Sequence, residues 1–202
     1  MENSIKNALS KAVDYATYRS TVTKLIAEGK STGNDQSEEI LQYSILNESR
    51  MNRLDKTMKV DGEIEAEFKA IDTAYTWLVL SEGWCGDAAQ ILPILHKMSE
   101  LNSHIDLKVV FRDENPELMD QFLTNGGKAI PKLIVLNSDH KVVAHWGPRP
   151  AAALKLIVDY KAEHGVVDEP AKAALQMWYL HDKGLSTQRE LLDIMKNVKS
   201  KK

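Results

Sequence analysis

An uninterrupted run of apolar residues in the middle of the chain constrains the fold more than any other feature. Trp77-Leu78-Val79-Leu80 contains no polar side chain, which indicates a strand buried on both of its faces. A strand of this kind has to be covered by other elements above and below the sheet. The run therefore predicts an α/β protein with helices on the faces of its sheet.

The pattern after this strand gives the order of the other elements. Residues 105–111 alternate between apolar and polar and predict a second strand, after a helix over about 88–101. Segments 132–136 and 141–146 predict two further strands, and the short turn between them makes an antiparallel hairpin. The first two strands need a parallel, right-handed crossover. The predicted fold class is a mixed four-stranded sheet flanked by helices.

Helical patterns also precede and follow this sheet. A single helix is predicted near the N-terminus, ending at Gly29, and more helices follow before residue 76 and after residue 164. No Pro/Gly-rich linker separates them from the sheet. We expect an N-terminal helical extension packed on the core (1–75), a core domain (76–164) and a C-terminal helical extension (165–202).

Three sequence patterns predict where particular helices begin. Asp35 with Glu38 and Thr187 with Glu190 have the spacing of capping boxes. Asn115-Pro116-Glu117 has the order of an N-cap, a first-turn proline and a first-turn acid, and predicts a helix to about residue 124.

Composition excludes several classes of function. The chain has 202 residues and a net charge of -3, so no basic excess points to nucleic acid. No apolar run approaches the roughly 20 residues that a membrane span requires, and residues 1–30 lack the apolar stretch of a signal peptide. The single cysteine rules out an intramolecular disulfide and a cysteine-based zinc site, and no histidine has a metal-binding spacing. We expect a cytoplasmic protein without a metal.

The single cysteine lies where a thiol can be activated. Cys85 falls between the buried strand and the start of the next helix, where free N–H groups and the helix dipole favour a thiolate. Asp87 acts in the opposite direction, because a nearby negative charge disfavours the thiolate. We expect the helix effect to prevail. The alternative is an inert, half-buried cysteine.

The residues around Cys85 resemble a known active site. Trp84-Cys85-Gly86-Asp87-Ala88 resembles the thioredoxin motif Trp-Cys-Gly-x-Cys. Pro93 and the pair Ile130-Pro131 fall where that family has its helix-kinking proline and its cis-proline. The strand order is also similar. The chain is therefore identified as a thioredoxin-like family protein with a single-cysteine motif, closest to a bacterial branch with a helical N-terminal region.

The resemblance implies roles for individual residues. Cys85 corresponds to the catalytic, attacking cysteine, and Trp84 to the tryptophan beside it. Gly86 and Asp87 complete the motif as substrate-binding candidates, although a helix N-terminal acid is the commoner role for Asp87 than a proton carrier. The backbone of the pair Ile130-Pro131 would bind an extended substrate strand.

Two departures from the family pattern leave the function open. Ala88 replaces the resolving cysteine, and Val79 stands where many thioredoxins have a buried aspartate. A mixed disulfide on Cys85 would need an external thiol, such as glutathione, or a partner's cysteine to release it. The expected partner is a disulfide- or thiol-bearing protein or a small thiol, with no tightly bound cofactor. The alternatives are a non-catalytic interaction module, and a glutathione-dependent transferase or iron–sulfur carrier.

Two surface features have both an ordinary and a functional interpretation. A row of cations along one helix is expected to form salt bridges with Glu48 or Asp55; the alternative is an anion site for a glutathione-like thiol. The row consists of Arg50, Arg53, Lys56 and Lys59. An apolar patch around Trp178 is expected to pack on the core, with a homodimer surface as the alternative.

Overall fold

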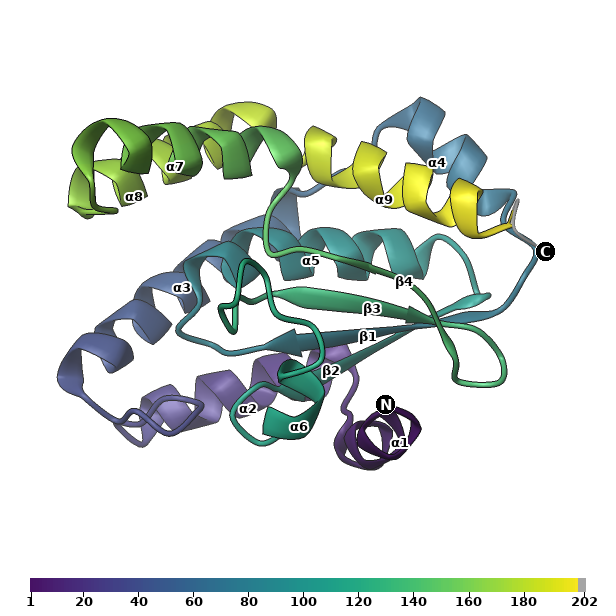
Figure 1. Cartoon of the computed structure of the whole chain (residues 1–202), viewed down its shortest axis with the longest axis horizontal. Helices are drawn as coiled ribbons and strands as arrows, with labels where there is room; N and C mark the ends of the chain where they lie inside the picture. The colour runs from purple at the N-terminus through teal and green to yellow at the C-terminus, as the bar shows by residue number, and fades with distance from the viewer. Residues whose placement is uncertain (200–202) are drawn as a thin grey trace.

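The computed structural model describes residues 1–199; the last three residues of the predicted C-terminal extension lie outside them. Its centre is one four-stranded sheet with the order β2-β1-β3-β4 (Figure 1). The strands are β1 (Tyr75–Ser81), β2 (Ile105–Phe111), β3 (Lys132–Leu136) and β4 (Val142–Trp146). β1 pairs with β2 in parallel, and the β1–β3 and β3–β4 pairs are antiparallel. The predicted mixed sheet is confirmed.

Helices cover both faces of the sheet, as Figure 1 shows. On one side lie α4 (Gly62–Lys69), α5 (Gly86–Glu100) and α9 (Leu185–Lys199). On the other side lie α1 (Glu2–Lys11), α2 (Tyr15–Ala27) and the short α6 (Pro116–Met119). The helix α3 (Glu38–Thr57) packs on α5, and the hairpin of α7 (Ala151–His164) and α8 (Glu169–Asp182) extends beyond α3.

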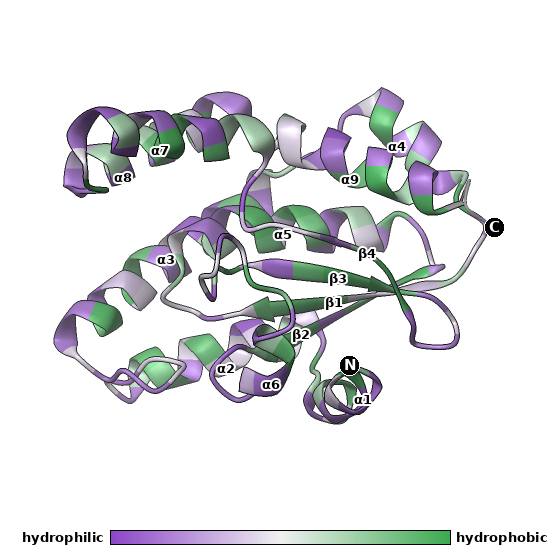
Figure 2. Cartoon of the chain, viewed as in Figure 1, coloured by the Kyte–Doolittle hydropathy of each residue, from purple (hydrophilic) through white to green (hydrophobic). Residues whose placement is uncertain are grey.

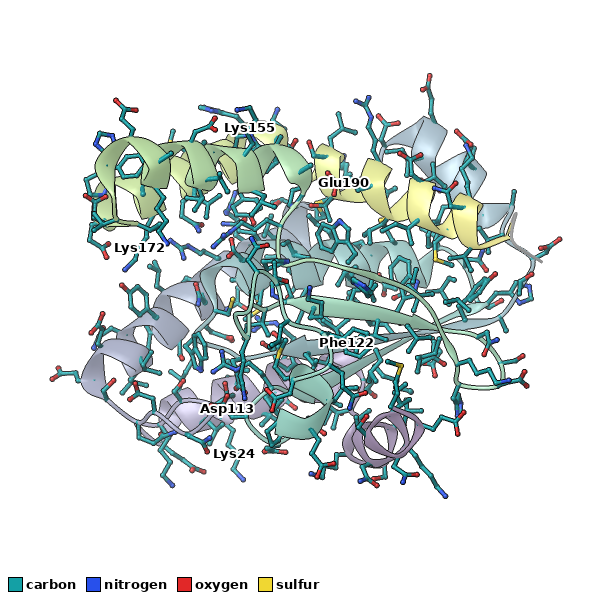
Figure 3. The ribbon with its side chains drawn as sticks, viewed as in Figure 1. Lys24, Asp113, Phe122, Lys155, Lys172 and Glu190 are labelled. Carbon is teal, nitrogen blue, oxygen red and sulfur yellow. The ribbon has the colours of Figure 1, made fainter. Side chains whose placement is uncertain are left out.

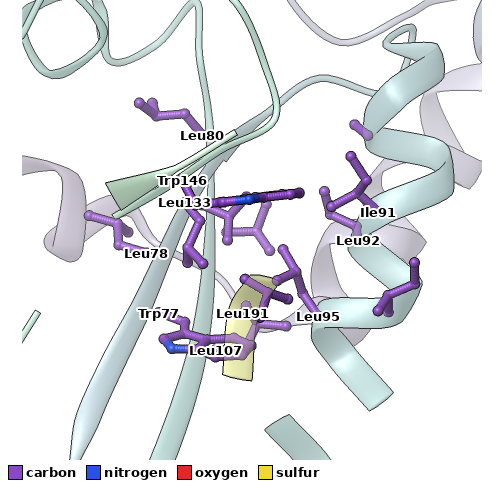
Figure 4. Close-up of a cluster of buried hydrophobic side chains, with 14 of the residues drawn as sticks. Trp77, Leu78, Leu80, Ile91, Leu92, Leu95, Leu107, Leu133, Trp146 and Leu191 are labelled. Atoms are coloured by element: carbon purple, nitrogen blue, oxygen red, sulfur yellow. The ribbon is translucent and has the colours of Figure 1, made fainter. Parts of the chain in front are cut away.

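The core forms around β1, as its composition predicts. All four side chains of Trp77-Leu78-Val79-Leu80 are fully buried. Hydrophobic colouring is concentrated on the strands and on the inward faces of the helices (Figure 2). In the close-up of Figure 4, Trp77 lies near Leu95 of α5 and Leu191 of α9. The C-terminal helix therefore completes the core on the face that α5 covers.

The single helix predicted near the N-terminus is two helices. The chain breaks at Val13, whose N–H and carbonyl exchange hydrogen bonds of 2.9 and 2.8 Å with Val109 of β2. Asp14 then caps α2 by accepting a 2.7 Å hydrogen bond from the backbone N–H of Thr17. Pairing with the exposed edge of β2 satisfies backbone groups that one turn of helix would otherwise satisfy.

Of the three predicted helix starts, only that of α6 is confirmed: Asn115 is its N-cap, and Pro116 and Glu117 lie in its first turn. Ser37, not Asp35, is the N-cap of α3, and α6 ends at Met119 rather than near residue 124. Helix α9 begins at Leu185, before Thr187, so the two residues of the predicted capping box lie inside the helix. The Glu190 carboxylate instead accepts hydrogen bonds of 2.7 Å from the Trp146 indole and from the backbone N–H of Ala151, which joins α9 to β4 and α7.

Candidate functional site

The register of β1 with β3 brings the two halves of the predicted site together. Leu80 lies opposite Lys132, so the loop that follows β1 meets the residues that precede β3. The Ile130–Pro131 peptide bond there is cis. The thiol of Cys85 donates a hydrogen bond to the carbonyl oxygen of Ile130 over 3.2 Å. The chain thus places its one thiol beside the Ile130–Pro131 bond.

The close approach of β4 fixes this corner of the site. Gly147, directly after β4, has a φ of +108°, and a Cβ atom added to it would lie 2.3 Å from the carbonyl oxygen of Pro131. No side chain fits at that distance, so only glycine allows the two backbones to meet here. Gly147 is not among the site residues predicted from the sequence. The available signal was a Gly-Pro pair at the end of a predicted strand.

Cys85 is the N-cap residue of α5, as the sequence analysis expects. Its sulfur accepts a hydrogen bond from the backbone N–H of Ala88 over 3.4 Å, and the residue is only 8% exposed. Burial nevertheless raises the pKa of Cys85 to about 12, and the negative charge of Asp87 acts in the same direction. The expectation that the helix N-terminus would prevail is wrong, because desolvation of the thiolate outweighs the N–H groups.

Asp87 is buried in a network that the sequence does not reveal. Its carboxylate forms an ion pair with Arg149 at 2.7 Å and accepts a 2.9 Å hydrogen bond from the Tyr179 hydroxyl. Arg149 follows β4, and Tyr179 lies on α8. Three segments far apart in the sequence therefore meet at the first turn of α5, and Asp87 links them.

The added helices hold the motif loop from two sides. Asn47 of α3 donates a 3.1 Å hydrogen bond to the carbonyl of Gly83, and Gln176 of α8 accepts a 2.8 Å hydrogen bond from Gln90. Gly86 is half-buried, and a Cβ atom added there would lie 3.6 Å from both Arg50 and Gln176. Segments predicted as extensions thus contribute contacts to the site itself.

Trp84 lies on the other side of the loop. It is half-buried, and the Arg112 guanidinium stands 4.7 Å from its ring centroid, within the range of a cation–π interaction. Its indole nitrogen also approaches Gly33, where an added Cβ atom would be 3.1 Å away. Trp84 therefore joins the motif to the loop before α3 and to the end of β2.

A buried acid next to the motif was missed by the sequence analysis. Glu82 is fully buried; one of its carboxylate oxygens accepts a 2.9 Å hydrogen bond from the backbone N–H of Asp113. Its other oxygen has no hydrogen-bond partner within residues 1–199. Burial raises the pKa of Glu82 to about 7. An acid that directly continues a buried strand was the available signal.

The two positions that depart from the thioredoxin pattern are both buried. Val79 is a fully buried apolar residue of the sheet, and Ala88 is buried in the first turn of α5. Within residues 1–199, no group of three histidine, cysteine or acidic side chains could hold a metal ion. No helix in this part of the chain has both the length and the apolar character of a membrane span.

Comparison with known proteins identifies the family. The sequence model of the family described as thioredoxin matches residues 33–163, which is more than half of the chain. The chain belongs to the thioredoxin family. The matched region contains the Cys85 motif, the Ile130–Pro131 bond and all four strands. It begins before α3, so the family resemblance also takes in helices that the sequence analysis assigned to the N-terminal extension.

Solved structures show the same fold. The chain is 18% identical to a crystal structure of an HIV epitope scaffold and to a crystal structure of a protein of unknown function from Pseudomonas aeruginosa. Both comparisons have a TM-score of 0.58 and cover 92% of this chain, with 99% and 98% of the other chains. The thioredoxin-like α/β fold is therefore confirmed, flanking helices included. No curated protein matches this sequence.

Proposed function

We propose that this chain is a single-cysteine thiol–disulfide oxidoreductase that works through a mixed disulfide. The observation that carries the proposal is the position of the Cys85 sulfur, at the N-cap of α5 and 3.2 Å from the carbonyl oxygen of Ile130. A substrate strand that paired with the backbone next to Pro131 would place a sulfur beside Cys85. The expected substrate is a disulfide-bearing protein or a small disulfide in a thiol-rich compartment such as the cytoplasm.

The reaction needs two exchange steps. The Cys85 thiol first loses its proton to solvent, and the thiolate attacks one sulfur of the substrate disulfide. A Cys85–substrate disulfide forms while the other substrate sulfur leaves as a thiolate and takes up a proton. Because Ala88 supplies no second thiol, an external thiol such as glutathione then attacks the mixed disulfide. This second step returns Cys85 to its thiol and leaves a disulfide between the external thiol and the substrate.

The pKa of about 12 makes the resting protein a slow nucleophile. At pH 7 the thiolate is therefore a very small minority, because burial raises the pKa of Cys85 well above neutral pH. The same carbonyl oxygen of Ile130 that a substrate strand would pair with now accepts the thiol hydrogen. Docking of a substrate N–H on that oxygen would compete with the thiol for it. We therefore expect a slow reaction with small disulfides and a faster one with substrates that pair with the backbone.

Intact-mass analysis with oxidised glutathione tests this proposal. The folded chain should gain one glutathione, faster at pH 9 than at pH 7, and reduced glutathione should remove it. Cys85→Ser should gain none, because the chain has no other cysteine. If the folded chain takes up no glutathione at either pH while the urea-unfolded chain does, the oxidoreductase proposal is wrong.

A second candidate function is a non-catalytic interaction module. It is favoured by the burial of Cys85, with its raised pKa, together with the absence of a second thiol at position 88. In that case the backbone beside Pro131 would bind an extended peptide without any exchange of sulfur. A partner retained equally by the wild-type chain and by Cys85→Ser would support this function, and loss of the partner in Cys85→Ser would contradict it.

A further inference from the structure

A cavity lies between the C-terminal end of α3, α5 and the junction of α8 with α9. Its volume is about 410 Å³, which is within the range of small-molecule sites. Apolar side chains from three elements line it, including Leu54, Ile94 and Leu180. Gln90 and Tyr179, which also belong to the contacts around the motif, form part of its wall.

The charges around this cavity all have one sign. Arg53, Lys59 and Lys183 line it, and no acidic side chain does. Within the described part of the chain, none of these three cations forms an ion pair with a carboxylate. The cavity thus combines an apolar surface with uncompensated positive charge.

The acids expected to form salt bridges with the row of cations pair with another residue. Glu48 and Asp55 both pair with Arg19 of α2, and Asp55 also accepts a hydrogen bond from Tyr15. The salt bridges predicted between these acids and the row are therefore not formed. Arg53 of α3, Lys59 just after α3 and Lys183 of the α8–α9 junction therefore line the cavity without an acidic partner.

We propose that this cavity binds an amphipathic organic anion. Its anionic head, a carboxylate or a phosphate ester, would lie among Arg53, Lys59 and Lys183, since cations of this kind bind both groups. Its apolar body would cover Leu54, Ile94 and Leu180, which removes apolar surface from water. The inference does not depend on thiol chemistry, and it can be tested in Cys85→Ser as well as in the wild-type chain.

The methyl group of Met58 is a reporter inside the cavity. The full chain, labelled with ¹³C-methyl methionine and with Met58 assigned from Met58→Leu, is titrated with four probes. Octanoate and octyl phosphate carry both a head and a body, 1-octanol lacks the charge, and acetate lacks the body. We expect at least one of the amphipathic anions to shift the Met58 signal saturably and to bind about tenfold or more tightly than 1-octanol and acetate. The stronger of the two identifies the head group.

Two double variants with the same change of net charge distinguish a specific site from general attraction between the anion and a positively charged surface. Arg53→Gln/Lys183→Gln should weaken binding of that probe by about tenfold or more. Lys24→Gln/Lys155→Gln changes the net charge equally on α2 and α7 (both lysines are labelled in Figure 3); neither lysine lines the cavity, and binding should be unchanged. The proposal is overturned if 1-octanol binds as tightly as the anions, if both double variants lose equal affinity, or if no probe shifts Met58 up to about 10 mM.

Discussion

At the scale of single residues, burial changes the chemistry of two neighbouring groups in the motif loop. Glu82 and Cys85 are three positions apart in the sequence, and both side chains are buried. Because water stabilises a thiolate and a carboxylate far better than the protein interior does, both groups hold their proton to a higher pH than in the unfolded chain. Each of them gives a prediction that can be tested without knowing the substrate.

Alkylation of Cys85 should show no activated thiol. In the folded protein, the rate of reaction with iodoacetamide should rise about tenfold for each pH unit between pH 7 and 10 without reaching a plateau, because the pKa of Cys85 is about 12. The urea-unfolded chain should instead show a midpoint near the free value of about 8.5. A midpoint in the folded protein below that value would contradict the burial described here.

Glu82→Gln should change how stability depends on pH. Folding raises the pKa of Glu82 from 4.5 to about 7, so the folded state binds more protons in this interval and loses stability as pH rises through it. The loss is about 3 kcal/mol of free energy of unfolding. Urea unfolding at pH 5 and pH 8 should show this loss in the wild-type chain and its absence in Glu82→Gln. The exposed substitution Glu63→Gln is the control, and an equal change there would contradict the assignment.

At the scale of elements, the strands follow the sequence more closely than the helix ends do. The alternation over β2 and the apolar run of β1 are local patterns, and each strand forms where its pattern predicts it. The predicted capping residue Glu190 shows the opposite case. Its hydrogen-bond donors, the Trp146 indole and the Ala151 N–H, lie about 40 positions earlier in the chain, and no local pattern predicts them.

Glu190→Ala should therefore lower the free energy of unfolding by more than the loss of a helix cap would. It leaves the N–H of the buried Trp146 without its acceptor, and we expect the free energy of unfolding to fall by about 2–3 kcal/mol. Glu190→Gln keeps an acceptor oxygen and should recover part of this loss. Equal stability of the two variants in thermal or urea unfolding would show that the hydrogen bonds of Glu190 contribute little.

At the scale of the whole molecule, polar contacts join the C-terminal hairpin of α7 and α8, and the segment before it, to the motif. Tyr179 and Arg149 both reach the buried carboxylate of Asp87. The site and the hairpin are therefore coupled: a change in one alters the contacts of the other. Residues of α3 line the cavity beside Tyr179 as well.

Tyr179→Phe removes one buried hydrogen bond of this coupling. We expect it to lower the free energy of unfolding by about 1–2 kcal/mol and to speed hydrogen exchange in α8. Tyr160→Phe removes a similar bond to Asp168 on the exposed side of the hairpin and should change stability by less than about 0.5 kcal/mol. Similar effects of the two substitutions would show that Asp87 does not anchor α8.

The sequence by itself determined the four strands and their order along the chain, and the positions of Cys85 and Pro131 between them. These follow from local periodicity and from residues close together in the sequence. Only the tertiary structure decided the protonation of Cys85, the partners of Asp87, the burial of Glu82 and the break at Val13. The physical reason is that desolvation and hydrogen-bond partners come from distant segments: Asp87 meets Tyr179 across 92 positions of sequence. A pattern of residue types fixes which groups are present, but the fold decides which of them lose water and which charges they face.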